Sequence, residues 1–299
     1  MDVYELLASF LAYHRAAGHS PATVTWYASE INRFLTWLTA NSLANGNWLA
    51  LPTIERYLAE SRTLDHNAPA TVATHYRGLK GFFGWLQTRG YIPVNPLATM
   101  PPPKVPRTEP RRASLQDYQR LLDSLPRDSW VGYRDRLIVV TLFLCGIRRG
   151  ECAGLKAEDY RLAEHVLKVD GKTGPRLVPL LPAVEVAFVE YQFNRPAYPA
   201  DLLFLSAGGG GQPDGVLLAG GIYQMLRRHC LTCGVKRLNP HSFRHGLAML
   251  LLNERHADMS LVQKVLGHSQ IGTTAARYAE WLTAGVVREF SEKMRGVGG

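Results

Sequence analysis

The chain has 299 residues, of which 46% are hydrophobic, a composition that excludes a disordered chain and favours two folded domains. Its 34 lysines and arginines exceed its 25 acidic residues and give a net charge of +9, which favours a polyanionic partner such as nucleic acid. The acidic N-terminus does not fit a secretory signal, and the longest apolar run, residues 137–145, is too short to span a bilayer, so we expect a cytoplasmic protein without a membrane partner.

Residues 1–92 predict a small helical domain. Ser20 followed by Pro21 is typical of a helix start, and Gly90 is typical of a helix end. We expect the aromatic side chains to form the core and the basic ones either to face DNA phosphates or to be solvated. Apolar residues recur at helical spacing in four segments, namely 3–17, 22–38, 53–64 and 71–88.

Prolines separate this domain from the rest of the chain. Seven of them lie between Ile92 and Pro110, accompanied by four basic residues at the far end. Proline lacks an amide donor and restricts the residue before it, so it disfavours helix. The composition predicts an extended basic linker over residues 93–113 and a second domain over residues 114–299.

The second domain is expected to be mainly helical with a small antiparallel sheet. Residues 166–169 and 176–180 predict a β-hairpin that carries Lys172 at or beside its turn. Gly208–Gly211 fits a flexible loop, because no known phosphate-binding glycine pattern surrounds it. A single CxxC pair, at Cys230, indicates no zinc site. Helices are expected from Ser114, over 134–144, from about 183, and over 222–231, 242–253, 260–266 and 275–294.

Two arginines lie beside features that suit phosphate binding. Arg148 follows the buried helix after a glycine, and Glu151, one helical turn later, is placed to orient its guanidinium. His241 and Arg244 lie at an expected helix start, where backbone amides already favour an anion. Arginine binds phosphate through paired, charge-assisted hydrogen bonds. Each feature alone also fits a surface ion pair or a chance pairing, and their combination is what predicts a phosphate site.

Three further residues complete what phosphodiester cleavage without a metal or cofactor requires. Lys172 can act as an acid, because burial among cations lowers a lysine pKa from about 10.4. His268 follows an expected helix end, where it can either bond a phosphate oxygen or cap the helix. Tyr278 is a poor nucleophile unless nearby cations stabilise its anion. The set predicts a tyrosine that cuts DNA.

In order and approximate spacing, these segments resemble the tyrosine recombinases, or phage integrase family, and most closely its Xer-like and transposon-borne members. The resemblance covers nearly the whole chain. The matching segments are residues 90–96, 146–151, 171–172 with 176–180, 241–245, 266–269 and 273–278.

The resemblance implies a role for each candidate residue. Arg148 and Arg244 would clamp the phosphate, and Lys172 would be the general acid. Tyr278 would attack DNA to form a 3′-phosphotyrosyl link and release a 5′ hydroxyl, without ATP. His241 and His268 would support the phosphate.

It also implies an assembly. A SAM-like core-binding domain and the catalytic domain would form a C-shaped clamp on double-stranded DNA with inverted-repeat core sites, at the nucleoid. A homotetramer would join two such sites, and a need for a second recombinase or accessory protein stays open. Integration, excision and resolution are all compatible with the sequence. An apolar stripe over residues 281–294 fits either docking on a neighbouring protomer or packing on its own domain.

One spacing differs from the family pattern. Tyr278 follows His268 by ten residues, one more than in most members, and an extra residue rotates a helical position by about 100°. No other tyrosine follows His268, so Tyr278 remains the predicted nucleophile. Two alternatives keep the fold but change the activity, namely a topoisomerase-like enzyme and a catalytically silent DNA-binding protein. The presence of Arg148, Arg244 and Tyr278 disfavours the silent protein.

Overall fold

The computed structural model describes residues 2–43, 47–63, 66–106, 112–171, 174–236, 238–266 and 284–297. The chain divides into two compact units, Met1–Thr108 and Glu109–Gly299, called here the N-terminal and C-terminal units. Within these described ranges, no helix has both the length and the apolar character that crossing a membrane requires.

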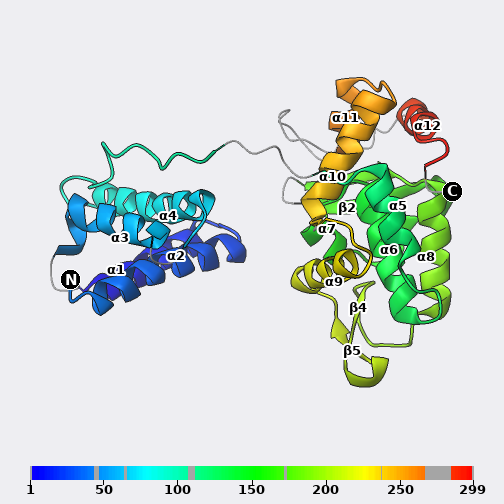
Figure 1. Cartoon of the computed structure of the whole chain (residues 1–299). Helices are drawn as coiled ribbons and strands as arrows, with labels where there is room; N and C mark the ends of the chain where they lie inside the picture. The colour runs from blue at the N-terminus through cyan, green and yellow to red at the C-terminus, as the bar shows by residue number, and fades with distance from the viewer. Residues whose placement is uncertain are drawn as a thin grey trace. The chain divides into compact units, whose positions relative to one another are not determined.

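The N-terminal unit is a bundle of helices with an aromatic core (Figure 1). Ser20 begins the second helix as expected, because its hydroxyl accepts a hydrogen bond from the Thr23 amide. Phe10, Phe34 and Phe82 are fully buried, which confirms that aromatic side chains build this core. The helices are α1 (Val3–Ala16), α2 (Pro21–Ala40), α3 (Leu51–Thr63) and α4 (Pro69–Thr88), with a short 3-10 turn, η1 (Asn47–Leu49), before α3.

The proline-rich segment is anchored at both ends. Residues 93–106 contain neither helix nor strand. Leu97 is fully buried in the N-terminal core, while Ala113 is buried in the C-terminal core. The Ala113 amide also donates a hydrogen bond to the Ser242 carbonyl. Leu97 therefore packs with the N-terminal unit, and Ala113 packs with the C-terminal unit.

The C-terminal unit is built around α6 (Trp130–Leu144), whose residues are buried on every side from Leu137 onward. Figure 1 shows α6 beside α5 (Leu115–Asp123) and α8 (Pro182–Asn194). The remaining helices are α7 (Arg149–Ala153), α9 (Ala219–Thr232), α10 (Pro240–Met249), the π-helical turn η5 (Leu250–Glu254), α11 (Met259–Leu266) and α12 (Ala284–Lys293), together with the short turns η2 (Ala157–Asp159), η3 (Leu162–Glu164) and η4 (Gly209–Gly211).

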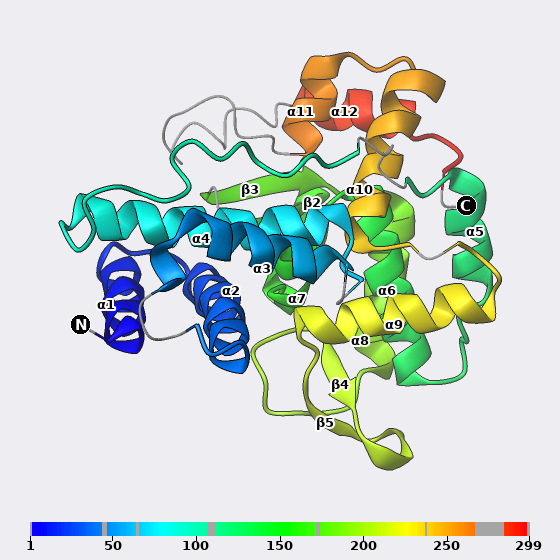
Figure 2. The same cartoon turned by 60° about the vertical axis from the view of Figure 1, so that its left-hand side comes forward.

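Two small antiparallel sheets accompany these helices, which confirms a mainly helical α+β fold. The first has the order β1-β2-β3, and its β2–β3 hairpin is the one that the sequence predicts. The second is a hairpin of β4 and β5 that projects from one end of the unit (Figure 2). The strands are β1 (Tyr160–Arg161), β2 (Val166–Gly171), β3 (Gly174–Pro179), β4 (Leu205–Ala207) and β5 (Pro213–Val216).

The structure refines three expectations. The glycine-rich segment Gly208–Gly211 connects β4 to β5 and contains the 3-10 turn η4, so it belongs to a hairpin that the sequence does not predict. The helix expected over 242–253 is α10 followed by the π-helical turn η5. Of the expected helix 275–294, the structure describes only α12, and its Phe290 is fully buried in the core of its own unit.

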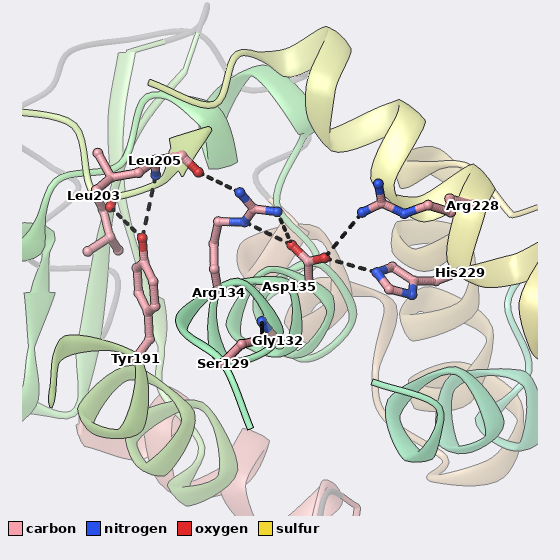
Figure 3. A network of polar contacts seen from close by, with 9 residues as sticks. All are labelled: Ser129, Gly132, Arg134, Asp135, Tyr191, Leu203, Leu205, Arg228 and His229. Carbon is pink, nitrogen blue, oxygen red and sulfur yellow. Dashed lines mark hydrogen bonds and ion pairs between the residues drawn. The ribbon is translucent and has the colours of Figure 1, made fainter. Parts of the chain in front are cut away.

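A buried ion-pair network ties α6 to α9 and β4 (Figure 3). Arg134 donates from Nε and Nη2 to Oδ1 of Asp135, at 2.8 and 2.6 Å, and from Nη1 to the Leu205 carbonyl at 2.6 Å. The other oxygen of Asp135 lies 2.9 Å from Nε2 of His229 and 3.8 Å from the Arg228 guanidinium. The network fixes the helix whose C-terminal end leads into the candidate site.

Candidate active site

Arg148 is the N-cap residue of α7 and lies three residues after Cys145, the C-cap residue of α6. Gly146 makes the turn between the two helices with φ of +60°, and a Cβ there would approach Leu266 Cδ2 to 2.6 Å. Glycine is therefore favoured by the backbone conformation, and a larger residue would also displace the Leu266 and Leu247 side chains. The side chain of Arg148 is 35% exposed, so it is anchored at one edge and open to solvent at another.

Glu151 accepts four hydrogen bonds through its two carboxylate oxygens. Two come from Arg148, from the backbone amide at 2.8 Å and from Nη1 at 2.8 Å. The other two come from the Arg176 guanidinium, at 2.9 and 2.8 Å. Burial alone would raise the pKa of Glu151, but the hydrogen bonds and charges of these two arginines lower it to about 2. The residue is a fixed anion that holds Arg148 in one orientation.

Arg176 is the residue that sequence reasoning missed as a site component. It lies on β3 with only 5% of its side chain exposed. The alternation of side chains along β3 could have indicated that Arg176 points inward, because Arg176 shares a face with the buried Val178 and not with the half-buried Leu177. A strand arginine on the inward face needs a buried acceptor, and Glu151 is that acceptor.

Arg244 is buried on α10 and joins two distant parts of the unit. Its Nη1 donates to the Gly146 carbonyl at 2.8 Å, and its Nη2 donates to the Leu266 carbonyl at 2.5 Å. Burial and the nearby charges of Arg148 and Arg176 lower the pKa of Arg244 to about 10, so the side chain remains a cation at neutral pH. The guanidinium is held by neutral carbonyls, which do not neutralise its positive charge.

His241 lies in the first turn of α10, on the same helix as Arg244. Its pKa is lowered, first by desolvation and then by His245, Arg244 and Arg148. Because an unperturbed histidine titrates near 6.5, this imidazole is mainly neutral at neutral pH. A neutral imidazole can donate one hydrogen bond and accept another beside the two arginines.

Lys172, His268 and Tyr278 lie outside the described residues. Residues before two of them in the chain are described. Gly171 and Gly174 pair at the end of the β2–β3 ladder, on either side of Lys172 in sequence, and α11 ends at Leu266, two residues before His268. The structure therefore brings together Arg148, Glu151, Arg244 and His241, and it does not test the placement of the other three.

The assembled groups suit an anion with several oxygens. Two arginines from different helices and a neutral imidazole provide charge-assisted donors at the N-termini of α7 and α10. Among the described residues, no group of three or more histidine, cysteine, aspartate or glutamate side chains is arranged to hold a metal ion. What the arrangement can do chemically is to bind a phosphate group and stabilise negative charge that develops on it.

The low pKa of Glu151 predicts a pH-dependent contribution to stability. Because the folded-state pKa lies near 2, below the usual 4.5, this group stabilises the fold above about pH 5, and the contribution is lost as the pH falls toward 2. We expect Glu151→Gln to be less stable than the wild type at neutral pH, with a difference that narrows in acid. Urea unfolding of both proteins at several pH values measures this, and a difference that widens in acid would contradict it.

Comparison with known proteins gives one family and several relatives. Residues 111–283 match the model of the phage integrase family. The chain is 30% identical to the tyrosine recombinase XerD of Proteus mirabilis, over 86% of this chain and 82% of that protein. It is 31% identical to XerD of Pseudomonas putida, over 86% of each. It is also 30% identical to XerC of Rhodospirillum centenum, over 92% of this chain and 74% of that one.

Solved structures share the fold at lower identity. A lambda integrase dimer bound to a COC′ core site matches with a TM-score of 0.70 at 18% identity, covering 90% of this chain and 96% of that one. The XerH recombinase bound to its difH substrate, in a pre-cleavage complex, matches with a TM-score of 0.66 at 21% identity, covering 95% and 81%. The fold of the present chain is thus that of DNA-bound recombinases.

Proposed function

Because this chain belongs to the phage integrase family and is a site-specific tyrosine recombinase, we propose that Tyr278 cleaves double-stranded DNA through a 3′-phosphotyrosyl intermediate. The observation that carries the proposal is the convergence of the Arg148 and Arg244 sites, since Arg244 bonds the carbonyl of Gly146, two residues before Arg148. Two cations held in this way form a phosphate clamp for the tyrosine to act on.

In this proposal each arginine binds a non-bridging oxygen of the scissile phosphate. Arg148 uses one nitrogen for Glu151 and keeps an exposed edge for the phosphate. Arg244 contributes a buried charge, and in the described part of the chain its guanidinium donates to backbone carbonyls. His241, mainly neutral at working pH, is suited to hydrogen-bond a phosphate oxygen. Charge that develops in the transition state is then met by donors already in place.

The reaction exchanges one bond to phosphorus for another. Tyr278 loses its phenolic proton to water, and its oxygen bonds to phosphorus while the bond from phosphorus to the 5′ oxygen breaks. Lys172 supplies the proton that the departing 5′ oxygen takes. The link retains the energy of the phosphodiester, so a 5′ hydroxyl can attack it, return the proton and reform DNA without ATP. His268 supports the phosphate.

We extend the proposal to the partners. Family membership and the charge of +9 support double-stranded DNA as the substrate. The helical domain predicted from the sequence, residues 1–92, would bind DNA together with the catalytic domain, residues 114–299, and the basic segment 93–113 would join them. The acting species would be a homotetramer on two inverted-repeat sites.

The two alternative activities are less well supported. The similar proteins named above are recombinases, which favours strand exchange over relaxation of supercoils alone. A silent DNA-binding protein would not need a buried cation such as Arg244 beside an oriented Arg148. Site-specific recombination is therefore the activity we assign.

A suicide duplex tests the covalent step directly. The DNA carries the binding site found by selection and a nick near the cut, so that the freed fragment diffuses away and the adduct accumulates. We expect a protein–DNA adduct that resists denaturation, with a nucleotide attached to Tyr278 when its peptides are analysed by mass spectrometry. Attachment to another residue would contradict the proposal, as would tight binding without any adduct under conditions in which a XerD relative reacts.

A further inference from the structure

Arg176 occupies a position that the proposed reaction leaves without a role. Its side chain is only 5% exposed, so it is not placed to be a surface contact to DNA. Both of its terminal nitrogens donate to Glu151, and among the described residues its Nε has no hydrogen-bond partner. Within the part of the chain that the structure describes, the guanidinium therefore serves one acceptor, and that acceptor is the carboxylate that holds Arg148.

We propose that Arg176 is a positioning residue of DNA cleavage, which acts through Glu151 on the guanidinium of Arg148. This inference rests on the role proposed above for Arg148 as a phosphate clamp. Arg176 would not touch the phosphate itself. It would set the orientation and the charge of the group that does.

The hydrogen-bond geometry supports an effect on orientation. An ionised carboxylate offers about four acceptor positions, and in Glu151 all four are used, two by each arginine. The Arg176 fork fixes the plane of the carboxylate, because two parallel hydrogen bonds do not allow it to rotate. With that plane fixed, Oε1 of Glu151 accepts a hydrogen bond from Nη1 of Arg148 at 2.8 Å, and the Arg148 guanidinium keeps one edge toward solvent.

The charges support an effect on phosphate affinity in the transition state. Arg148, Arg176 and Glu151 together carry one net positive charge. Without Arg176, Arg148 and Glu151 would form a neutral pair, and Glu151 would attract the Arg148 guanidinium away from a phosphate without the two hydrogen bonds that Arg176 donates to it. Arg176 thus allows a carboxylate to orient Arg148 without cancelling its charge.

The hairpin backbone closes around this pair. A Cβ built on Gly171 would lie 2.6 Å from Oε1 of Glu151 and 3.3 Å from Nη1 of Arg176. Only glycine leaves room for β2 to lie so close to the carboxylate, so both strands of the hairpin contact the same ion pair. The Arg176–Glu151 pair therefore joins the hairpin to the N-terminus of α7.

A double-mutant cycle tests the inference. Single-turnover cleavage of the suicide duplex is measured at saturating protein for the wild type, Arg176→Gln, Arg148→Gln and the double variant. We expect Arg176→Gln to slow cleavage by about 10- to 100-fold, as is common for residues that orient a reacting group, with unchanged DNA affinity. If Arg176 acts through Arg148, the double variant is no slower than Arg148→Gln alone. Multiplied effects would overturn the inference.

Two further variants separate positioning from general stability. Arg176→Lys keeps the charge without the fork and should recover part of the lost rate, which also covers the case in which Arg176→Gln does not fold. Arg134→Gln is the matched control, because Arg134 is an equally buried arginine paired with Asp135 in the same unit. It should lower the melting temperature and leave the cleavage rate unchanged. Equal rate losses in Arg134→Gln and Arg176→Gln would overturn the inference.

The cycle also distinguishes this inference from the proposal on which it rests. If Arg148→Gln cleaves at the wild-type rate, the clamp role of Arg148 is wrong. If Arg148→Gln is impaired and Arg176→Gln is not, the clamp stands and the positioning role of Arg176 is wrong.

Discussion

A Tyr278→Phe variant is expected to bind DNA with wild-type affinity and to form no covalent adduct. The substitution removes one hydroxyl and keeps the ring, so it deletes the nucleophile with little change in shape. No described tyrosine that is buried in the C-terminal unit can replace it readily, because burial raises the pKa of Tyr118, Tyr160 and Tyr191. Denaturing electrophoresis of the suicide-duplex reaction, beside a binding isotherm, measures both quantities.

Tyr160→Phe provides a matched control for the same chemical change. The Tyr160 hydroxyl is hydrogen-bonded to Thr141 at 2.9 Å inside the core. Its loss should cost some stability and leave the adduct yield at the wild-type level. An adduct that persists in Tyr278→Phe would assign the attack to a different residue and would refute the role of Tyr278.

Replacing Arg244 with glutamine should damage both catalysis and folding. Loss of one preorganised donor to developing charge typically slows a reaction by about 100- to 1,000-fold, and we expect a loss of that size in single-turnover cleavage. The Gly146 and Leu266 carbonyls would also lose their charged donor, and each buried group left unpaired costs about 1–3 kcal/mol. Arg244→Lys should retain more stability than Arg244→Gln but not the cleavage rate, because an ammonium cannot bond two carbonyls and a phosphate in the same fork geometry.

Cleavage kinetics and urea unfolding on the same samples separate the two effects. Arg228→Gln is a suitable control, since this arginine is 66% exposed and lies 3.8 Å from Asp135 at the edge of the buried network. It should alter neither measurement much, because exposed ion pairs contribute little. A wild-type cleavage rate in folded Arg244→Gln would show that the buried cation serves the fold alone.

Local sequence patterns predict the contacts that form between residues close together in the chain. The contact between Arg148 and Glu151 follows from a spacing of three residues at a helix start, and the hairpin around Lys172 follows from its turn residues. In both cases the residues that interact are close in the chain, so periodicity and turn chemistry are sufficient to anticipate them.

Contacts between residues far apart in the chain cannot be predicted from such local patterns. Arg244 bonds a carbonyl 98 residues earlier and another 22 residues later, and only the packing of α6, α10 and α11 brings these together. Arg176 is separated from Glu151 by 25 residues, so the alternation of β3 can place this arginine on the inward face but cannot identify the carboxylate that it binds. The sequence does not predict the β4–β5 hairpin, because its glycine-rich connection lacks the alternation of apolar and polar residues that is typical of strands.

The hydrogen bond from Arg244 to the Leu266 carbonyl couples DNA binding to the position of α11. Leu266 is the last residue of α11, and the chain continues from it toward His268 and Tyr278. The Arg244 side chain is therefore affected by two events. One is the binding of an anion to its guanidinium, and the other is a displacement of the end of α11, whose carbonyl it binds. By linkage, if the docked anion favours one position of that helix end, this position must favour the anion by the same factor. Substitutions at the end of α11 should consequently be visible in DNA affinity, even where the substituted side chain touches no DNA.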